Sequence, residues 1–513
     1  MIIHDSAIKQ DKLLLLGALL CGCLHHMMFY EKAWGISYPL FMFVFYIYFY
    51  WAVKERCELR FDASLLMVVP IVLLSLTYTA FTNSLFAFLN ALVIPGLIVI
   101  HTTWVMRKGA VHWYERGIIQ AVLEQLFLHT LSYVPMPVKV AIRSLAGKIN
   151  ASRSQQIWKI SAGIAISLPL LLLVVSLLAS ADTMFDRMLS KLPELLKQFE
   201  IMTFMFRTGW IVIVSIALFA YIYGLLHPKE IKQPMRVEGE WGRDSIKSAN
   251  PDEYPLVANK PMRFDATITA TILLIMNAVY VLFAVVQFSY FFAGGSALLP
   301  DGVTYAEYAR RGFAELVVVT VINFTLLMVT LHGVDRSVPS MDRFLRVLLA
   351  MLIGCTAVML CSAYFRLSMY EEAYGFTISR VLVHAVMIFL LLLFAIALIK
   401  VKKDHFQLMK PYLIAGMASY VLLNYIQVDG IIASSNIKRY ETTGKIDTGY
   451  LGSLSFEVVP YLISLQSKHP EVEGTKDALQ TIKDRLPLKL ETSWLSFNVS
   501  EWRAAKALQK QTD

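Results

Sequence analysis

The sequence predicts an all-α fold, a polytopic transmembrane helix bundle with about eleven spans and a small external helical tail at its C-terminal end. Two observations predict it. Of the 513 residues, 57% are hydrophobic and 17% are charged, whereas soluble domains contain about 45–50% apolar and about 25% charged residues. The apolar residues also gather into runs of about 20, the length that a helix needs to cross about 30 Å of hydrocarbon.

Eleven such runs follow one another along the chain. The third and fourth are separated only by Phe81 to Asn83, which predicts a tight helical hairpin. We expect the spans at residues 13–30, 33–53, 64–81, 84–106, 158–180, 203–226, 266–293, 312–331, 344–364, 380–399 and 408–426.

The distribution of Lys and Arg predicts the orientation of these spans, because loops on the cytoplasmic side of a membrane carry an excess of both. The basic loops lie near residues 54–60, 107–153, 229–263, 336–343 and 400–403, and the alternate loops hold far fewer cations. We therefore expect the N-terminus inside and the C-terminus outside. The first span is alternatively a cleaved signal, since residues 20–23 loosely resemble a lipoprotein cleavage box; this would leave the other spans as they are.

The spans and loops divide the chain into six expected segments. Two of them carry amphipathic helices. One lies within 107–157, with Tyr114, Ile118, Val122 and Leu126 on its apolar stripe, and is expected on the inner leaflet or alternatively on a protein partner. The other, at 183–200, is expected on the outer leaflet. The segments are a four-span block at 1–106, a cytoplasmic amphipathic segment at 107–157, two spans at 158–226, a polar cytoplasmic linker at 227–264, a five-span core at 265–426, and an external tail of short helices at 427–513.

Several function classes are disfavoured. The net charge of +9 comes from short loops between apolar runs, which is a topology signal, so we do not expect nucleic-acid binding. The five cysteines are scattered and are not spaced like a disulfide framework or a zinc site. No phosphate-binding, nucleophile-elbow, dinucleotide or zinc-protease motif stands in a meaningful place. We expect no cofactor and no metal.

Three segments expected on the outer side are dense in Tyr, Arg and acidic residues. At the first, Tyr308, Arg311 and Glu315 share one helical face. They are either an interfacial anchor, with the arginine reaching the headgroups, or one wall of a polar site open to the outside. The full candidate binding cluster is Tyr308, Arg311, Glu315, Arg366, Tyr370, Tyr374, Arg380, Asp429, Asn436, Arg439, Tyr440, Asp447 and Tyr450. Catalytic residues are not predicted.

Two further features have an ordinary explanation beside a functional one. The adjacent acids Glu371 and Glu372 point about 100° apart on a helix, so we interpret them as a solvated edge and not as a catalytic pair. His384 lies within an expected span, where a packed, hydrogen-bonded side chain is the plainer interpretation and a proton relay is the alternative.

Three blocks in the second half of the chain resemble a known family. They read "YAEYARRGFAEL", "MYEEAYGFTISR" and "NIKRYETTGKIDTGYLGSLSFEVVPYL", and together they cover about residues 265–465. They resemble a family of bacterial multi-pass membrane proteins, domain of unknown function 4173, which is close to the 4153 group. The resemblance implies a protein of the bacterial cytoplasmic membrane and supplies no activity.

The leading hypothesis is a non-enzymatic envelope sensor, scaffold or ligand-binding protein that uses the outward-facing cluster. Its expected partners are membrane lipids and an envelope ligand or protein. The first alternative is a membrane-embedded transferase or hydrolase acting on a lipid-linked substrate, with Glu315 or Asp429 as acid or base. The second alternative is a transporter, for which Glu315, Asn323 and Asn277 are the pathway candidates.

Overall fold

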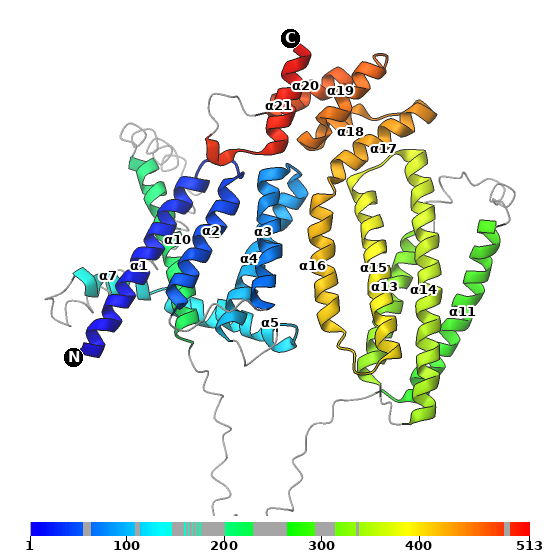
Figure 1. Ribbon diagram of the computed structural model, residues 1–513, viewed down its shortest axis with the longest axis horizontal. Coiled ribbons are helices and arrows are strands. Elements are labelled where there is room, and N and C mark those ends of the chain that lie inside the picture. Colours follow the sequence, from blue (N-terminus) through cyan, green and yellow to red (C-terminus); the bar gives the residue numbers. More distant parts are fainter. Residues whose placement is uncertain are drawn as a thin grey trace, which may run out of the picture. The chain divides into compact units, whose positions relative to one another are not determined.

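The computed structural model describes residues 2–54, 63–107, 113–145, 201–228, 264–292, 313–334, 338–486 and 493–512, with a few single positions between 159 and 175. Within these ranges the fold is helical (Figure 1), and the only β-type pairing is an isolated bridge between Phe264 and Val334. The all-α prediction is confirmed for this part of the chain.

Ten of the eleven expected spans coincide with helices. The remaining one, at 158–180, lies largely outside the described residues, as does the expected amphipathic helix at 183–200. The ten helices are α1 (Ile2–Phe29), α2 (Ser37–Val53), α3 (Ala63–Ala80), α4 (Ser84–Met106), α10 (Ile201–Leu226), α11 (Ala266–Phe292), α13 (Phe313–Gly333), α14 (Pro339–Tyr374), α15 (Ile378–Lys402) and α16 (Met409–Tyr425).

Seven of the described helices are long and apolar enough to cross a membrane: α1, α4, α10, α11, α13, α14 and α15. The apolar parts of α2 and α3 are shorter. Helix α16 has 17 residues, and at 1.5 Å per residue it reaches only about 26 Å, less than the hydrocarbon thickness. The count of eleven spans and the orientation of the termini therefore stay predictions.

The chain divides into two compact units. An N-terminal unit comprises Met1–Ile231 and Pro487–Arg503, and a C-terminal unit comprises Lys232–Leu486 and Ala504–Asp513. The last helix, α21 (Val499–Thr512), therefore begins in one unit and ends in the other.

In the N-terminal unit, α1 packs against α10 and α2, and α3 packs against α4. The tight α3–α4 hairpin is confirmed: the side chain of Asn83 caps α4 by accepting the N–H of Phe86 at 3.1 Å. Buried polar groups join the helices, as where the Asn90 amide donates to Thr77 Oγ1 at 3.0 Å. Such bonds satisfy polar groups that hydrocarbon does not.

A short stretch of the chain's C-terminal region belongs to the N-terminal unit. The amide of Asn498 donates to the backbone carbonyls of Tyr78 and Phe81, at 2.8 and 2.9 Å, and Ser500 Oγ donates to that of Ala80 at 2.9 Å. These carbonyls end α3 and have no partner within a helix. The sequence pattern of a single tail over 427–513 did not indicate this division.

The opposite end of the N-terminal unit is covered by the segment that follows α4. It forms α5 (Arg116–Leu123), a π-helix η1 (Glu124–Thr130), α6 (Leu131–Tyr133) and α7 (Met136–Leu145). We call Arg116–Leu145 the collar, because it packs against α4, α10 and α1 in turn.

In the C-terminal unit, α14 is the central helix and packs against α11, α13 and α15. Its core is apolar, with Leu345, Leu349, Leu352 and Phe394 fully buried. Two asparagines connect α11 and α13 to α14 by hydrogen bonds. Asn277 on α11 donates to the carbonyl of Leu348, and Asn323 on α13 donates to Thr356 Oγ1, both at 2.9 Å. These two transporter candidates therefore act as interhelical contacts.

Residues 428–485 form a compact group of helices, which we call the tail module. Buried Leu451, Val458, Leu462 and Leu465 make its core, which confirms the short helices expected there. Its elements are α17 (Val428–Thr443), α18 (Thr448–Ser453), η2 (Phe456–Val458), α19 (Val459–Lys468) and α20 (Thr475–Arg485).

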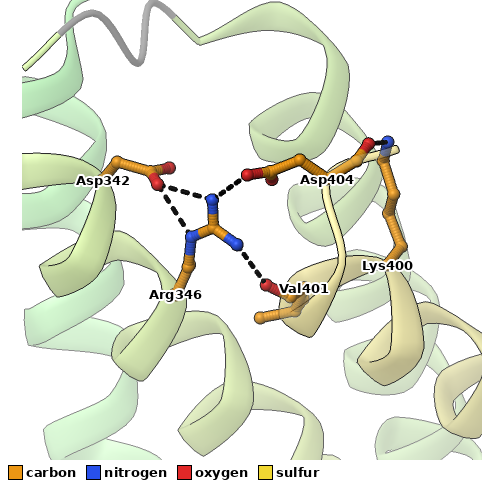
Figure 2. Close-up of polar contacts among 5 residues, drawn as sticks. All are labelled: Asp342, Arg346, Lys400, Val401 and Asp404. Carbon is orange, nitrogen blue, oxygen red and sulfur yellow. Dashed lines mark hydrogen bonds and ion pairs between the residues drawn. The ribbon is translucent and has the colours of Figure 1, made fainter. Parts of the chain in front are cut away.

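Arg346, near the N-terminal end of α14, connects this helix to the end of α15 and to the loop that follows it (Figure 2). Its guanidinium pairs with Asp342 at 2.7 Å and with Asp404, and it donates to the carbonyl of Val401 at 3.1 Å. Charge-assisted hydrogen bonds of this kind are about twice as strong as neutral ones.

Replacing Arg346 by Ala removes all three contacts, and we expect it to destabilise the protein by about 1–3 kcal/mol. Thermal unfolding of the detergent-solubilised protein measures this loss. Arg343→Ala is the matched control, since Arg343 is exposed one turn earlier on α14, and we expect a change within about 0.5 kcal/mol. Equal effects of the two substitutions would contradict the assignment.

Candidate functional site

The candidate site is built around residues 372–378, where α14 ends and α15 begins. We call this stretch the corner. Residues 375–377 are not helical, so their backbone polar groups, together with the last carbonyls of α14, need partners from elsewhere. The tail module supplies most of them.

The side-chain amide of Asn436 on α17 forms two hydrogen bonds with the backbone of the corner. Its Oδ1 accepts the N–H of Phe376 and its Nδ2 donates to the carbonyl of the same residue, both at 2.9 Å. Gly375 makes this approach possible, because it has φ +88° and no side chain. A Cβ there would lie 2.8 Å from Asn436 Oδ1.

Arg439, one turn further along α17, closes the end of α14. Its Nε donates to the carbonyl of Glu372 and its NH2 to that of Ala373, both at 2.6 Å, while NH1 donates to the carbonyl of Lys445 at 2.9 Å. The planar fork of a guanidinium suits such divergent acceptors. A cation at a helix C-terminus also complements the helix dipole.

Tyr450 on α18 makes the third contact, where its hydroxyl accepts the N–H of Ile378 at 3.0 Å. Burial raises the pKa of the Tyr450 phenol. Asp447 positions this tyrosine by capping α18, accepting the N–H of Tyr450 at 2.8 Å. We call Asn436, Arg439 and Tyr450 the clamp, because together they bind the tail module to the corner.

Arg380 supports the corner from α15. It donates to the carbonyl of Gly375, and its guanidinium lies 4.4 Å above the ring centre of Tyr370. A cation held over an aromatic face is attracted by the ring quadrupole. Two residues of the predicted cluster, one on each helix, therefore fix the angle between α14 and α15.

A buried acid–imidazole pair joins α14 to α15 beside the corner. His384 Nε2 lies 3.0 Å from Glu371 Oε2, with 3% of the Glu371 side chain and 12% of the His384 side chain exposed. Among the described residues, Glu371 Oε1 and His384 Nδ1 have no hydrogen-bond partner. The ring of Tyr364 contacts the imidazole edge-on, 4.2 Å between centres.

This pair corrects one interpretation and refines another. Glu371 is buried, so the solvated edge expected at Glu371 and Glu372 is present only at Glu372, which is exposed. The 100° divergence of consecutive helical residues explains why the two differ. His384 is hydrogen-bonded, as its plainer interpretation predicted.

The other predicted site residues of the C-terminal unit are not part of the clamp. Asp429 is buried and accepts the N–H of Ser455 at 3.2 Å, so it orders the tail module. The hydroxyl of Tyr440 lies 3.5 Å from Glu471 Oε1. Hydrogen bonds from the backbone N–H of Glu471 and from His469 hold the pKa of the Glu471 carboxyl below its usual range. Arg366 donates to the side chain of Gln287 on α11 at 3.3 Å. Tyr374 is 57% exposed.

The first predicted segment is mostly untested. Tyr308 and Arg311 lie outside the described residues, and Glu315 is exposed in the first turn of α13. Their shared helical face stays a prediction. The structure does bring the second and third segments together, through hydrogen bonds that Asn436, Arg439 and Tyr450 make with the backbone of the corner. Whether these residues bind a ligand stays a prediction.

No group of three or more His, Cys, Asp or Glu residues suited to a metal ion occurs in the described ranges. The tail module and the end of α21 share a shallow groove of about 280 Å³. It is lined by glutamines, two lysines and three other residues: Gln466, Ser467, Lys476, Leu479, Gln480, Lys483, Leu508 and Gln511.

Sequence reasoning missed the two residues on which the corner depends most, Gly375 and the paired Glu371. A signal for Gly375 was present, because a glycine directly after a long helical pattern is typical of a helix end with positive φ. No pattern in the sequence indicated that Glu371 pairs with His384, thirteen residues further along the chain.

Fold and site together define an all-helical protein with several membrane-spanning candidates and a helical module clamped to the end of two of them. The chain belongs to the DUF4153 family: the family model, described as a domain of unknown function, matches residues 68–465. The expected neighbouring group 4173 is not shown, and the match extends far upstream of residue 265. No curated protein and no solved structure matches the chain.

Proposed function

We propose that this protein is a non-enzymatic, multi-pass protein of the bacterial cytoplasmic membrane that acts as a sensor or scaffold. The observation that carries the proposal is the clamp, through which the tail module holds the backbone between α14 and α15. A ligand or protein that binds the tail module and shifts α17 thereby changes the ends of both helices.

The proposed orientation places the tail module outside the cell and the collar inside. The Lys/Arg distribution supports it. Within the C-terminal unit, the Arg346 contacts lie at one end of α14 and the clamp at the other. Arg346 and Glu371 are 25 residues apart, about 37 Å along a helix, which exceeds the hydrocarbon thickness. Both ends of α14 then lie at membrane–water boundaries.

A sensor differs from a passive anchor because a change at the clamp moves the other end of α15. A fluorescent label at Lys403→Cys, exposed near the far end of α15, reports on movement there. We expect Arg439→Ala, which removes three hydrogen bonds of the clamp, to shift the emission of this label, and to raise hydrogen exchange at residues 376–380 by about tenfold or more.

Lys438→Ala is the matched control, since Lys438 is the exposed neighbour of Arg439 on α17. It should leave both readouts unchanged. Faster exchange at the corner with no change at the far label would support a scaffold and exclude the sensor. No change in either readout would exclude both forms of the proposal.

A second candidate is a membrane-embedded transferase or hydrolase acting on a lipid-linked substrate. The observation that favours it is the Glu371–His384 pair, since a carboxylate that orients an imidazole is an arrangement used for general base catalysis. This moves the acid–base role from Glu315 or Asp429 to His384. Lipid profiles of a deletion strain test this candidate. The wild-type protein should restore the normal profile in that strain, and the His384→Gln variant should not.

A further inference from the structure

Two polar side chains of the collar, Gln125 and His129, face the protein. Gln125 Nε2 donates to the carbonyl of Tyr221 at 3.3 Å, and both Gln125 and His129 are buried. Gly224 permits this approach, because a Cβ there would lie 3.1 Å from Gln125 Nε2 and 3.3 Å from His129 Cβ. Tyr221 and Gly224 belong to the last turns of α10, which ends at Leu226.

Further polar contacts lock the collar in this position. Arg107, directly after α4, pairs with Glu124 at 3.2 Å, and its second amino group lies 3.4 Å from His129 Nε2. The hydroxyl of Tyr133 donates to the carbonyl of His227 at 2.8 Å. The collar is therefore held at the level where α4 and α10 both end.

The outward face of the collar is apolar. Six large apolar side chains on it are 41–62% exposed: Ile119, Leu123, Phe127, Leu128, Leu131 and Val134. This corrects the expected apolar stripe of Tyr114, Ile118, Val122 and Leu126, because Ile118 is buried. The exposed stripe is the one that begins at the next residue, Ile119.

The π-helix explains why this stripe stays on one side over sixteen residues. Positions four apart drift by about 40° around a regular α-helix. In the wider i→i+5 turns of η1 the drift has the opposite sense. Alternating the two helix types keeps Ile119, Leu123, Phe127 and Leu131 in line.

We propose that the collar is a lipid-inserted interfacial helix, with Leu123, Phe127 and Leu131 among the acyl chains of one leaflet. Three observations select lipid as the occupant. The stripe lies level with the ends of α4 and α10, which marks a membrane boundary. The helices α1 and α4, which the collar packs against, also expose large apolar side chains, as at Leu16 and Leu92.

The third observation is charge. The exposed cations Lys139 and Arg143 stand on α7, directly after the apolar stripe. A basic flank beside an inserted apolar face fits a leaflet that contains anionic headgroups. Figure 1 shows α5 and α7 lying across the long axes of α1 and α4, as a helix in the plane of the membrane does.

Fluorescence quenching in proteoliposomes tests the proposal on the full chain, after its native cysteines are replaced. A bimane label at Leu123→Cys or Phe127→Cys is compared with one at Lys468→Cys, an exposed position of the tail module. We expect phosphatidylcholine brominated on its acyl chains to quench the collar labels at least several-fold more than the label at 468. Iodide should show the reverse order.

Two outcomes overturn the proposal. If iodide quenches the label at 127 as strongly as the label at 468, the stripe faces water. If neither quencher reaches it, a second copy of the chain or another protein covers the stripe. Since single cysteine labels at exposed positions leave the polar contacts of the collar intact, these readings do not depend on a disruptive variant.

The same samples test whether Lys139 and Arg143 contact anionic headgroups. Adding phosphatidylglycerol to the vesicles should increase the bromolipid quenching of the label at 127, and Arg143→Ala together with Lys139→Ala should abolish the increase. An identical response in the double variant would remove the headgroup contact from the proposal, and an absent response in the wild type would do the same.

Discussion

Replacing Glu371 by Ala is expected to destabilise the protein by about 1–3 kcal/mol, because it leaves the buried His384 without its hydrogen-bond partner. Glu371 has only 3% of its side chain exposed, so water replaces the lost carboxylate poorly. Unfolding of the solubilised protein by heat or by a denaturing detergent measures the loss. Glu371→Gln, which retains a hydrogen-bond acceptor, should lose clearly less.

Glu372→Ala is the matched control for this prediction, since it removes an adjacent exposed carboxylate, and we expect a change within about 0.5 kcal/mol. A double-mutant cycle with His384→Ala should give a coupling energy of at least about 1 kcal/mol. Additive effects of the two single substitutions would show that the pair does not hold α14 and α15 together.

Replacing Gly375 by Ala is the second substitution with a large expected effect. The backbone has φ +88° and ψ 165° at this position, a region that is essentially restricted to glycine and costs other residues about 1–3 kcal/mol. The added Cβ would also lie 2.8 Å from Asn436 Oδ1, which is too close for any ordinary contact. We expect a loss of about 2 kcal/mol or more in thermal unfolding, with faster hydrogen exchange in α17.

Gly354→Ala on the same helix, α14, is the control. A Cβ there meets nothing within 4 Å, and alanine is favoured over glycine inside a helix by about 0.5–1 kcal/mol. Combining Gly375→Ala with Asn436→Ala relieves the contact but keeps the backbone strain and removes the bonds to Phe376. We therefore expect the double variant to lose less than the sum of the two single losses. Full stability of the single variant Gly375→Ala would contradict the described geometry of the corner.

The positions of the helices were largely predictable from sequence. Runs of about 20 apolar residues and the interruption at residues 81–83 each predicted helices that the structure contains. Hydrophobic periodicity is local information, so it is readable without the fold. The rotation of a helix about its axis is less readable, as the collar shows.

The candidate site was predictable only as a set of residues. The sequence indicated that the Tyr-, Arg- and acid-rich stretches near 366–380 and 429–450 belong together, and the structure joins them through Asn436, Arg439 and Tyr450. The sequence did not indicate that these three side chains would form hydrogen bonds with backbone carbonyls and N–H groups of the corner. A side chain that binds a ligand and one that caps a helix are the same residue type in a sequence.

By itself, the sequence determined that this protein is helical, that it has apolar segments long enough to cross a membrane, and where most of the described ones lie. Helix α1 begins eleven residues before the expected span and α14 ends ten residues after it, because both helices continue beyond their apolar parts. These properties follow from composition and from contacts along the chain. Only the tertiary structure decided that Glu371 meets His384, that Arg439 closes α14, and that the apolar stripe of the collar faces outward. Those depend on which helix faces meet, which is set by packing between residues far apart in the chain and leaves no local pattern.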